Sequence, residues 1–287
     1  MGTSNSTNNG RVRIVTDSAC DLPIGLCEEL GISVVPLTIR FGEQEYVDRV
    51  ELTNDQFWTK VRTASALPET AAPSVGAFEE TFRALADDGA AGVVCVNLSS
   101  KMSATMQSAQ VAAKALDGIC PIEVVDSKNA TMGIGHLAAH AARLALEGAD
   151  VATIVASTEE RRERSHLLGI VDTLDFLRRG GRIGGAQAFL GSVLSIKPII
   201  EVRDGSVEAA GKVRTRSKAL RFAVDKLKEV DVESLAVMHA QADDVEEFLD
   251  MLDPIVPRAE ILVGEIGPVV GVHVGPGTIG TVWTVRA

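Results

Sequence analysis

The sequence is poor in aromatic residues and lacks paired cysteines, and each feature excludes a class of protein. Phenylalanine, tryptophan and tyrosine make up 4% of its 287 residues, too few for a surface on which nucleic-acid bases could stack. The four cysteines include no C-x-x-C pair, which argues against a metal site or a disulfide framework and is compatible with a reducing cytoplasm. We therefore expect a protein without a structural metal ion or disulfide.

Long apolar segments and excess positive charge are also lacking. No segment approaches the roughly 18 consecutive apolar residues that cross a bilayer, so we expect no stable membrane insertion. The net charge of −11 argues against a general nucleic-acid-binding protein and against adhesion to an anionic membrane surface. Residues 1–10 are polar and lack the basic and apolar regions of a signal peptide, so we expect a disordered tail on a cytoplasmic protein.

What the chain does contain is a regular alternation of apolar runs and helix-forming segments. The run 93–96 predicts a strand buried on both faces, and the segment 104–116, rich in alanine and glutamine, predicts the helix that follows it. Apolar runs at 12–16 and 122–125 predict two more strands in the same rhythm. Strands and helices that alternate in this way form mostly parallel, right-handed α/β sheets.

The pattern changes near residue 151, which predicts a second domain. A charged helix is followed by a β-hairpin with a tight turn at Asp204–Gly205 and by further helices and strands. We therefore expect an α/β protein of two domains. The N-terminal domain, at 11–160, has a Rossmann-like, mostly parallel sheet with helices on both faces. The C-terminal α/β domain, at 161–287, has a mixed sheet, and its final strands could pack back on the first domain.

Capping residues, glycines and prolines give several local predictions. Thr53 and Ser74 each precede an amphipathic segment, where a helix N-cap belongs. The same reasoning predicts Asp21 as an N-cap, a proline-bounded loop at 66–74, a loop containing Gly133 and Gly135, a helix at 186–194 and a glycine-rich loop at 271–278.

Polar side chains gather where three of the predicted strands end. Asp17–Ser18, Ser99–Ser103 and Asp126–Ser127 each follow an apolar run, and ligands of α/β sheets bind beyond the carboxyl ends of the strands. The Ser99–Ser103 bend also precedes a predicted helix, whose N-terminus offers unpaired N–H groups and the positive end of a dipole. Such a bend can hold a phosphate or a carboxylate, although its serines could also serve only to cap the helix.

Other basic residues are further candidates for binding an anion. Arg182 lies in a glycine turn, where its guanidinium could bind a carboxylate or form a structural salt bridge. His273, between glycines, could donate to an anion or hold a turn. The basic run from Lys212 to Arg221 could be a solvated face or a docking surface for an acidic or phosphate-bearing partner.

Motifs of several enzyme and metalloprotein classes are missing or incomplete. The sequence has no Walker A motif and no G-x-S-x-G nucleophile motif, and the G-x-G-x-x-G match at 275–280 has no βαβ unit around it. His136 and His140 are one helical turn apart, but the glutamate of an H-E-x-x-H zinc site is missing. We therefore predict two structural histidines, no catalytic residues, no metal site and no cofactor.

Motifs along nearly the whole chain resemble those of one family. They are T-D-S with D-L between 16 and 22, T-A-A-P-S at 70–74, S-S-K-M-S-A-T-M-Q-S-A at 99–109, D-S at 126–127, G-G-R-I at 180–183, I-K-P at 196–198 and G-V-H-V-G-P-G at 271–277. Taken in this order, they are similar to the motifs of the DegV proteins, the fatty-acid-binding subunits of bacterial fatty acid kinase.

This resemblance implies a ligand and a set of site residues. A DegV-like protein holds one long-chain fatty acid in a tunnel between its two domains. The carboxylate would be bound by Thr70 and Ser103, with His273 and Arg182 close to it. Three further residues, Ser99, Ser100 and Met102, would be neighbours in the pocket.

The resemblance also implies a partner in place of an activity of this chain. A separate ATP-binding kinase subunit would phosphorylate the bound acid to an acyl phosphate, and it would dock on Arg214, Lys212 and Arg216. Two alternatives remain open on the sequence alone. One is a small-molecule transferase or kinase that uses the Ser99–Ser103 bend as a phosphate cradle. The other is a regulatory module that senses a lipid without a kinase.

Overall fold

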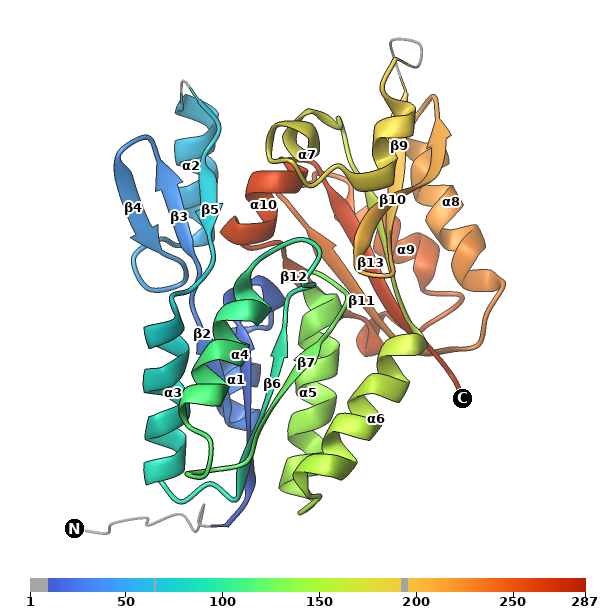
Figure 1. The fold of residues 1–287 in the computed structure, drawn as a ribbon. Coiled ribbons are helices and arrows are strands. Elements are labelled where there is room, and N and C mark those ends of the chain that lie inside the picture. The colour runs from blue at the N-terminus through green and yellow to red at the C-terminus, as the bar shows by residue number, and fades with distance from the viewer. Residues whose placement is uncertain (1–9, 65, 192–195) are drawn as a thin grey trace, which may run out of the picture.

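A four-stranded parallel sheet forms the core of the first part of the chain in the computed structural model, which describes residues 10–64, 66–191 and 196–287 (Figure 1). Its order is β2-β1-β6-β7, and every pairing in it is parallel. This confirms the predicted mostly parallel sheet. Its strands are β1 (Val12–Asp17), β2 (Ile32–Val35), β6 (Gly92–Asn97) and β7 (Ile122–Asp126).

Helices cover both faces of this sheet because its central strands are apolar on both faces. β6 is buried along its whole length. Val93 and Cys95 pack with Phe82 of one helical layer, whereas Val94 and Val96 point into the core on the opposite face. The helices of this part are α1 (Ile24–Leu30), α3 (Val75–Asp87), α4 (Thr105–Ala115), α5 (Met132–Leu146) and α6 (Val151–Glu163).

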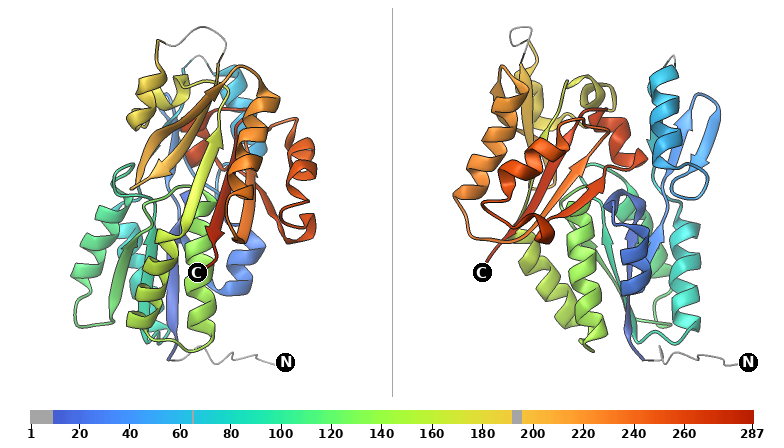
Figure 2. Two further views of the ribbon diagram at one scale, coloured as in Figure 1. Left: turned by 90° about the vertical axis from the view of Figure 1, so that its right-hand side faces the viewer. Right: turned by 180° about the vertical axis from the view of Figure 1, so that it is seen from behind.

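A six-stranded mixed sheet forms the core of the second part, in the order β10-β9-β8-β13-β11-β12. Its pairings are antiparallel except for the parallel pair β11–β12. The helices α8 (Arg216–Lys228) and α9 (Val245–Leu252) cover its outer face (Figure 2). Its strands are β8 (Ser165–Ile170), β9 (Lys197–Arg203), β10 (Ser206–Val213), β11 (Val232–His239), β12 (Leu262–Glu265) and β13 (Ile279–Val285).

A small antiparallel sheet and a helix lie beside the second part of the chain, at the upper left of Figure 1. The sheet has the order β4-β3-β5, with β3 at Thr38–Phe41, β4 at Gln44–Val47 and β5 at Glu69–Ala71. Helix α2 (Asn54–Thr63) begins at Thr53, whose side chain and that of Gln56 form a capping box. Helix α10 (Pro268–Val274) contacts both α2 and α7 (Asp175–Arg179), so it bridges the small sheet and the second part of the chain (Figure 1).

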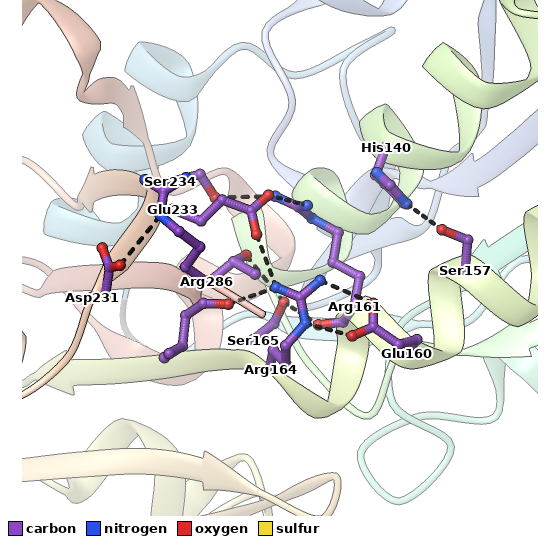
Figure 3. A network of polar contacts seen from close by, with 12 residues as sticks. His140, Ser157, Glu160, Arg161, Arg164, Ser165, Asp231, Glu233, Ser234 and Arg286 are labelled. Carbon is purple, nitrogen blue, oxygen red and sulfur yellow. Dashed lines mark hydrogen bonds and ion pairs between the residues drawn. The ribbon is translucent and has the colours of Figure 1, made fainter.

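A network of ion pairs ties α6 to the six-stranded sheet (Figure 3). The Arg164 guanidinium donates to Glu160 Oε1 at 2.6 Å, to Glu233 Oε2 at 2.8 Å and to the backbone oxygen of Val285 at 2.6 Å. Arg161 donates to Glu233 Oε1 at 2.6 Å. Single exposed ion pairs stabilise a protein little, but a partly buried network with a shared carboxylate fixes the end of α6 against β11 and β13.

Several local predictions are wrong, and tertiary contacts explain those for Asp21, Gly133 and Gly135. Asp21 does not cap α1, because its carboxylate binds groups far along the chain, and the N-cap is Pro23. Gly133 and Gly135 lie inside α5 and not in a loop. A Cβ added to Gly135 would stand 2.7 Å from the backbone oxygen of Cys20, so this glycine allows close packing of the helix. The predicted loop at 66–74 contains the strand β5, and the predicted loop at 271–278 contains most of α10. The predicted helix at 186–194 overlaps only the end of the 3-10 helix Gly184–Phe189, and its residues 192–194 lie outside the described part of the chain.

The α/β fold with one parallel and one mixed sheet is therefore confirmed. The domain boundaries stay a prediction. Near the predicted boundary at 160, α6 ends at Glu163, and the final strand, β13, lies inside the six-stranded sheet. Among the described residues, no helix combines the length and the apolar character that a bilayer span requires.

Candidate functional site: an apolar cavity with a polar end

A cavity lies between the carboxyl ends of the parallel strands and the inner face of the six-stranded sheet, with α10 as one wall. The cavity and its open mouth together hold about 810 Å³ free of protein atoms. Side chains that point inward from β8 and β9 form much of its surface. The apolar lining includes Leu98, Leu167, Ile200, Val202, Ile266 and Val269.

Four polar residues of this cavity gather at one end. Thr70 comes from β5, Ser103 from the bend before α4, Arg182 from the turn after α7, and His273 from α10. The four residues predicted to bind a carboxylate therefore line one cavity although they are up to 203 positions apart. Their role in binding stays a prediction.

Arg182 supplies the positive charge at the polar end of the cavity. Its Nε donates to the backbone oxygen of Met102 at 3.0 Å and its Nη1 to that of Gly180 at 2.7 Å. No acidic side chain among the described residues forms an ion pair with it. The two carbonyls hold the guanidinium in place without neutralising it, so this end of the cavity is suited to an anion.

His273 is neutral at pH 7. Burial, reinforced by the nearby Arg182 guanidinium, lowers the pKa of the His273 imidazole to about 4. Its Nε2 lies 3.0 Å from Thr70 Oγ1, whereas its Nδ1 is buried and has no hydrogen-bond partner among the described residues. Because a proton on Nδ1 would be a buried donor without an acceptor, we assign the proton to Nε2, which donates to Thr70. The Thr70 hydroxyl proton is then free to donate to a ligand.

The assignment predicts a distinctive NMR signature for His273. At pH 7 its Nδ1 should show the ¹⁵N shift of an unprotonated ring nitrogen, and the ring should become charged only when the pH falls toward about 4. A pH titration of the ¹⁵N-labelled protein measures both, and the variant His273→Asn identifies the signal by its disappearance. A midpoint near the ordinary histidine value of about 6.5 would contradict the lowered pKa, and the ¹⁵N shift of a protonated Nδ1 at pH 7 would contradict the assigned tautomer.

The serines of the Ser99–Ser103 bend have separate partners. The Ser99 hydroxyl donates to the backbone oxygen of Gly205 in the β9–β10 turn at 2.7 Å, and the Ser100 hydroxyl donates to Asp126 Oδ2 at 2.5 Å. Ser103 lies with its Oγ 2.9 Å from Thr105 Oγ1. Ser103 and Met102 line the cavity, but Ser99 and Ser100 do not. Two of the hydroxyls of the proposed phosphate cradle are thus already engaged, which disfavours the transferase alternative.

Sequence reasoning missed a buried carboxylate that supports this site. Asp21 Oδ2 accepts from the Thr131 hydroxyl at 2.6 Å, and its Oδ1 accepts from the N–H of Gly267, the N-cap of α10, at 3.0 Å. Burial raises the pKa of the Asp21 carboxyl to about 7, against the opposing effect of Arg49. Asp21 therefore holds the start of α10, the helix that carries His273. The only signal in the sequence was its place in the T-D-S-x-x-D-L motif.

The three residues predicted to dock a partner have different surroundings. Arg214 is exposed, and no described residue forms a hydrogen bond or ion pair with it. The Lys212 ammonium lies over the ring of Phe189, 5.6 Å from its centre. Arg216 forms a two-pronged ion pair with Asp244 at 2.8 and 3.0 Å, so it is less free to meet a partner than we predicted.

The described residues contain no group of three or more histidines, cysteines, aspartates and glutamates arranged to hold a metal ion. His136 is buried, and burial lowers its pKa to about 4. His140 Nε2 lies 2.9 Å from the Ser157 hydroxyl, in a contact between α5 and α6 (Figure 3). Both positions fit structural histidines.

Known proteins of one family match nearly the whole chain. A family model described as "Uncharacterised protein, DegV family" matches residues 11–286. A DegV domain-containing protein of Halalkalibacterium halodurans is 38% identical over 283 residues, which cover 96% of this chain and 99% of that protein.

Two solved structures with the same fold are described as fatty-acid-binding proteins. A DegV family protein from Thermus thermophilus is 36% identical, with a TM-score of 0.89 over 96% of this chain and 100% of that one. DegV from Bacillus subtilis is 30% identical, with a TM-score of 0.87 over 97% of this chain and 100% of that one.

Proposed function

The chain belongs to the DegV family, and we propose that it binds one long-chain fatty acid in the cavity between its parallel and mixed sheets. We further propose that it presents the carboxylate to a separate ATP-binding kinase subunit, which converts it to an acyl phosphate. In this proposal the chain is not itself an enzyme, and it works in the cytoplasm. The fatty acid lies in a tunnel between two domains, at 11–160 and 161–287. The fatty-acid-binding proteins of T. thermophilus and B. subtilis, which share its fold, support the ligand class.

The observation that carries the proposal is the contrast between the two ends of the cavity. Most of the wall is aliphatic, and each buried methylene of an acyl chain contributes about 0.8 kcal/mol. At the polar end, Arg182 has a positive charge without a described acidic partner, and Thr70 and Ser103 supply hydroxyls. An amphiphile with a long apolar tail and a single anionic head satisfies both ends.

Native mass spectrometry of the freshly purified protein tests the ligand. We expect one fatty acid for each chain, released on denaturation and identified by its mass, or uptake of one palmitate or oleate by the empty protein. A chain that carries no fatty acid and takes up neither would refute the proposed ligand.

The partner is tested at Arg214, the exposed member of the basic run. Arg214→Ala should leave fatty-acid affinity unchanged, because the residue lies outside the cavity lining. It should slow phosphorylation by the kinase subunit on the order of tenfold, as loss of a central interface arginine does. Lys228→Ala, at the far end of α8, is the matched control and should affect neither. Loss of both activities in Arg214→Ala would contradict a docking role.

A further inference from the structure

A second, polar hollow opens directly outside the polar end of the cavity. This outer pocket and its open mouth hold about 750 Å³ free of protein atoms. It shares Thr70, Arg182 and His273 with the cavity, so the two hollows meet at these side chains. The other residues that line it are Leu67, Pro68, Glu69, Arg179, Gly180 and Val272.

The outer pocket contains a guanidinium that no described residue binds. Arg179, the last residue of α7, is exposed, and no described residue forms a hydrogen bond or ion pair with it. Its neighbour Arg178 instead pairs with Asp175 at 2.9 Å. The acidic residue of the lining, Glu69, already forms an ion pair with Arg40. The charge of Arg179 is therefore free to attract an anion in this pocket.

The glycine turn after α7 places two arginines around the same space. Gly181 has φ of +70°, a conformation that favours glycine, and the chain reverses so that Arg182 N donates to Leu177 O at 2.9 Å. A Cβ on Gly180 would stand 2.3 Å from His273 Nδ1, so the floor of the pocket leaves no room for a side chain there. Arg182 thus faces the inner cavity and the outer pocket, whereas Arg179 lines the outer pocket alone.

We propose that the outer pocket binds the phosphoryl group of the acyl phosphate and that Arg179 is a ligand of this group. The inference rests on the proposed function. In the transfer, a carboxylate oxygen of the bound acid attacks the terminal phosphorus of the partner's nucleoside triphosphate. A new O–P bond forms, the bond from phosphorus to the bridging oxygen breaks, and the nucleoside diphosphate leaves with that electron pair.

The position of the product follows from this step. The carboxyl carbon stays at the polar end of the cavity, so the new phosphoryl group must lie on its solvent side, which is the outer pocket. The group carries up to two negative charges, and an arginine can bind phosphate oxygens with two parallel N–H donors. Arg179 should therefore contribute to holding the phosphorylated acid but not the free acid.

Calorimetry with two ligands separates these roles. The ligands are palmitate and 2-oxoheptadecylphosphonate, a stable analogue of palmitoyl phosphate in which a CH2 group replaces the bridging oxygen. We expect Arg179→Gln to weaken phosphonate binding about tenfold and to change palmitate binding by less than about twofold, because its contact is with the charged phosphoryl group alone. Arg178→Gln, the matched control on the same helix, should change neither affinity. An equal effect of Arg179→Gln on both ligands, or no effect on the phosphonate, would overturn the proposal.

Two further outcomes separate this inference from the proposed function. If the unaltered protein binds neither palmitate nor the phosphonate, the fatty-acid function itself fails. If palmitate binds normally, while inorganic phosphate followed by ³¹P NMR binds through Arg179 and the phosphonate does not, the pocket is a site for free phosphate. That last result would overturn the link to the acyl phosphate.

Discussion

Replacing Arg182 with glutamine should weaken the binding of a long-chain fatty acid by about 10- to 150-fold. A hydrogen bond to a charged group contributes about 1.5–3 kcal/mol, and each 1.4 kcal/mol is a factor of ten in affinity. The loss should be large here because the guanidinium is held at the polar end of the cavity by two carbonyls and has no described acidic partner to share its charge.

Titration of palmitate into the two proteins measures this effect, with circular dichroism to verify that the variant is folded. Arg178→Gln is the control, since its side chain is exposed and pairs with Asp175. The two proteins should differ far less in their affinity for an alcohol of the same chain length, because the alcohol has no negative charge for Arg182 to bind. If the variant binds palmitate as tightly as the original, Arg182 is not the carboxylate ligand and the polar end must be reassigned.

Replacing Asp21 with alanine should lower the free energy of unfolding by about 3–5 kcal/mol, the usual cost of removing one partner from a buried polar cluster. The change would leave the Thr131 hydroxyl and the Gly267 N–H without their acceptor, and it would remove the carboxylate 4.0 Å from Arg49. Asp21→Asn should cost less, since an amide can still accept from Gly267 and donate to Thr131.

Denaturant unfolding followed by intrinsic fluorescence measures the loss. Asp88→Ala offers a matched control, because Asp88 is an exposed carboxylate paired with Arg13 and its removal should cost at most about 1 kcal/mol. The Asp21 variants should also bind fatty acid more weakly, because the start of α10 loses its anchor and His273 moves with it. Equal stability of the Asp21→Ala and Asp88→Ala proteins would show that the buried cluster is not what fixes α10.

Features determined by neighbouring residues could be predicted from the sequence. Thr53 and Ser74 cap α2 and α3 as expected, since a capping hydroxyl needs only an N–H three residues away. Asp204 and Gly205, both with positive φ, form the expected tight turn between β9 and β10. The double-sided burial of β6 likewise follows from its own unbroken apolar run.

Features determined by distant residues could not be predicted. His273 was expected in a loop because Gly271 and Gly275 flank it, yet it lies on α10, where an added Cβ at Gly271 would stand 2.9 Å from the Phe57 ring. That glycine permits close helix packing and does not break the helix. Asp21 was assigned to the nearest helix, although its partners lie 110 and 246 positions away. The four cavity residues were grouped only through the family resemblance, since nothing local links Thr70 to His273.

The position of β13 has a consequence for how the protein is synthesised. This strand follows every other strand of the six-stranded sheet in sequence, yet it pairs with both β8 and β11 in the middle of that sheet. Until it emerges from the ribosome, both neighbours keep an unpaired edge, and such edges invite association with other chains. We therefore expect ribosome-bound chains that stop at residue 278 to be cut by protease throughout β8–β11 while the parallel sheet already resists. The ligand cavity, which uses both sheets, would then be completed only after β13 has been synthesised.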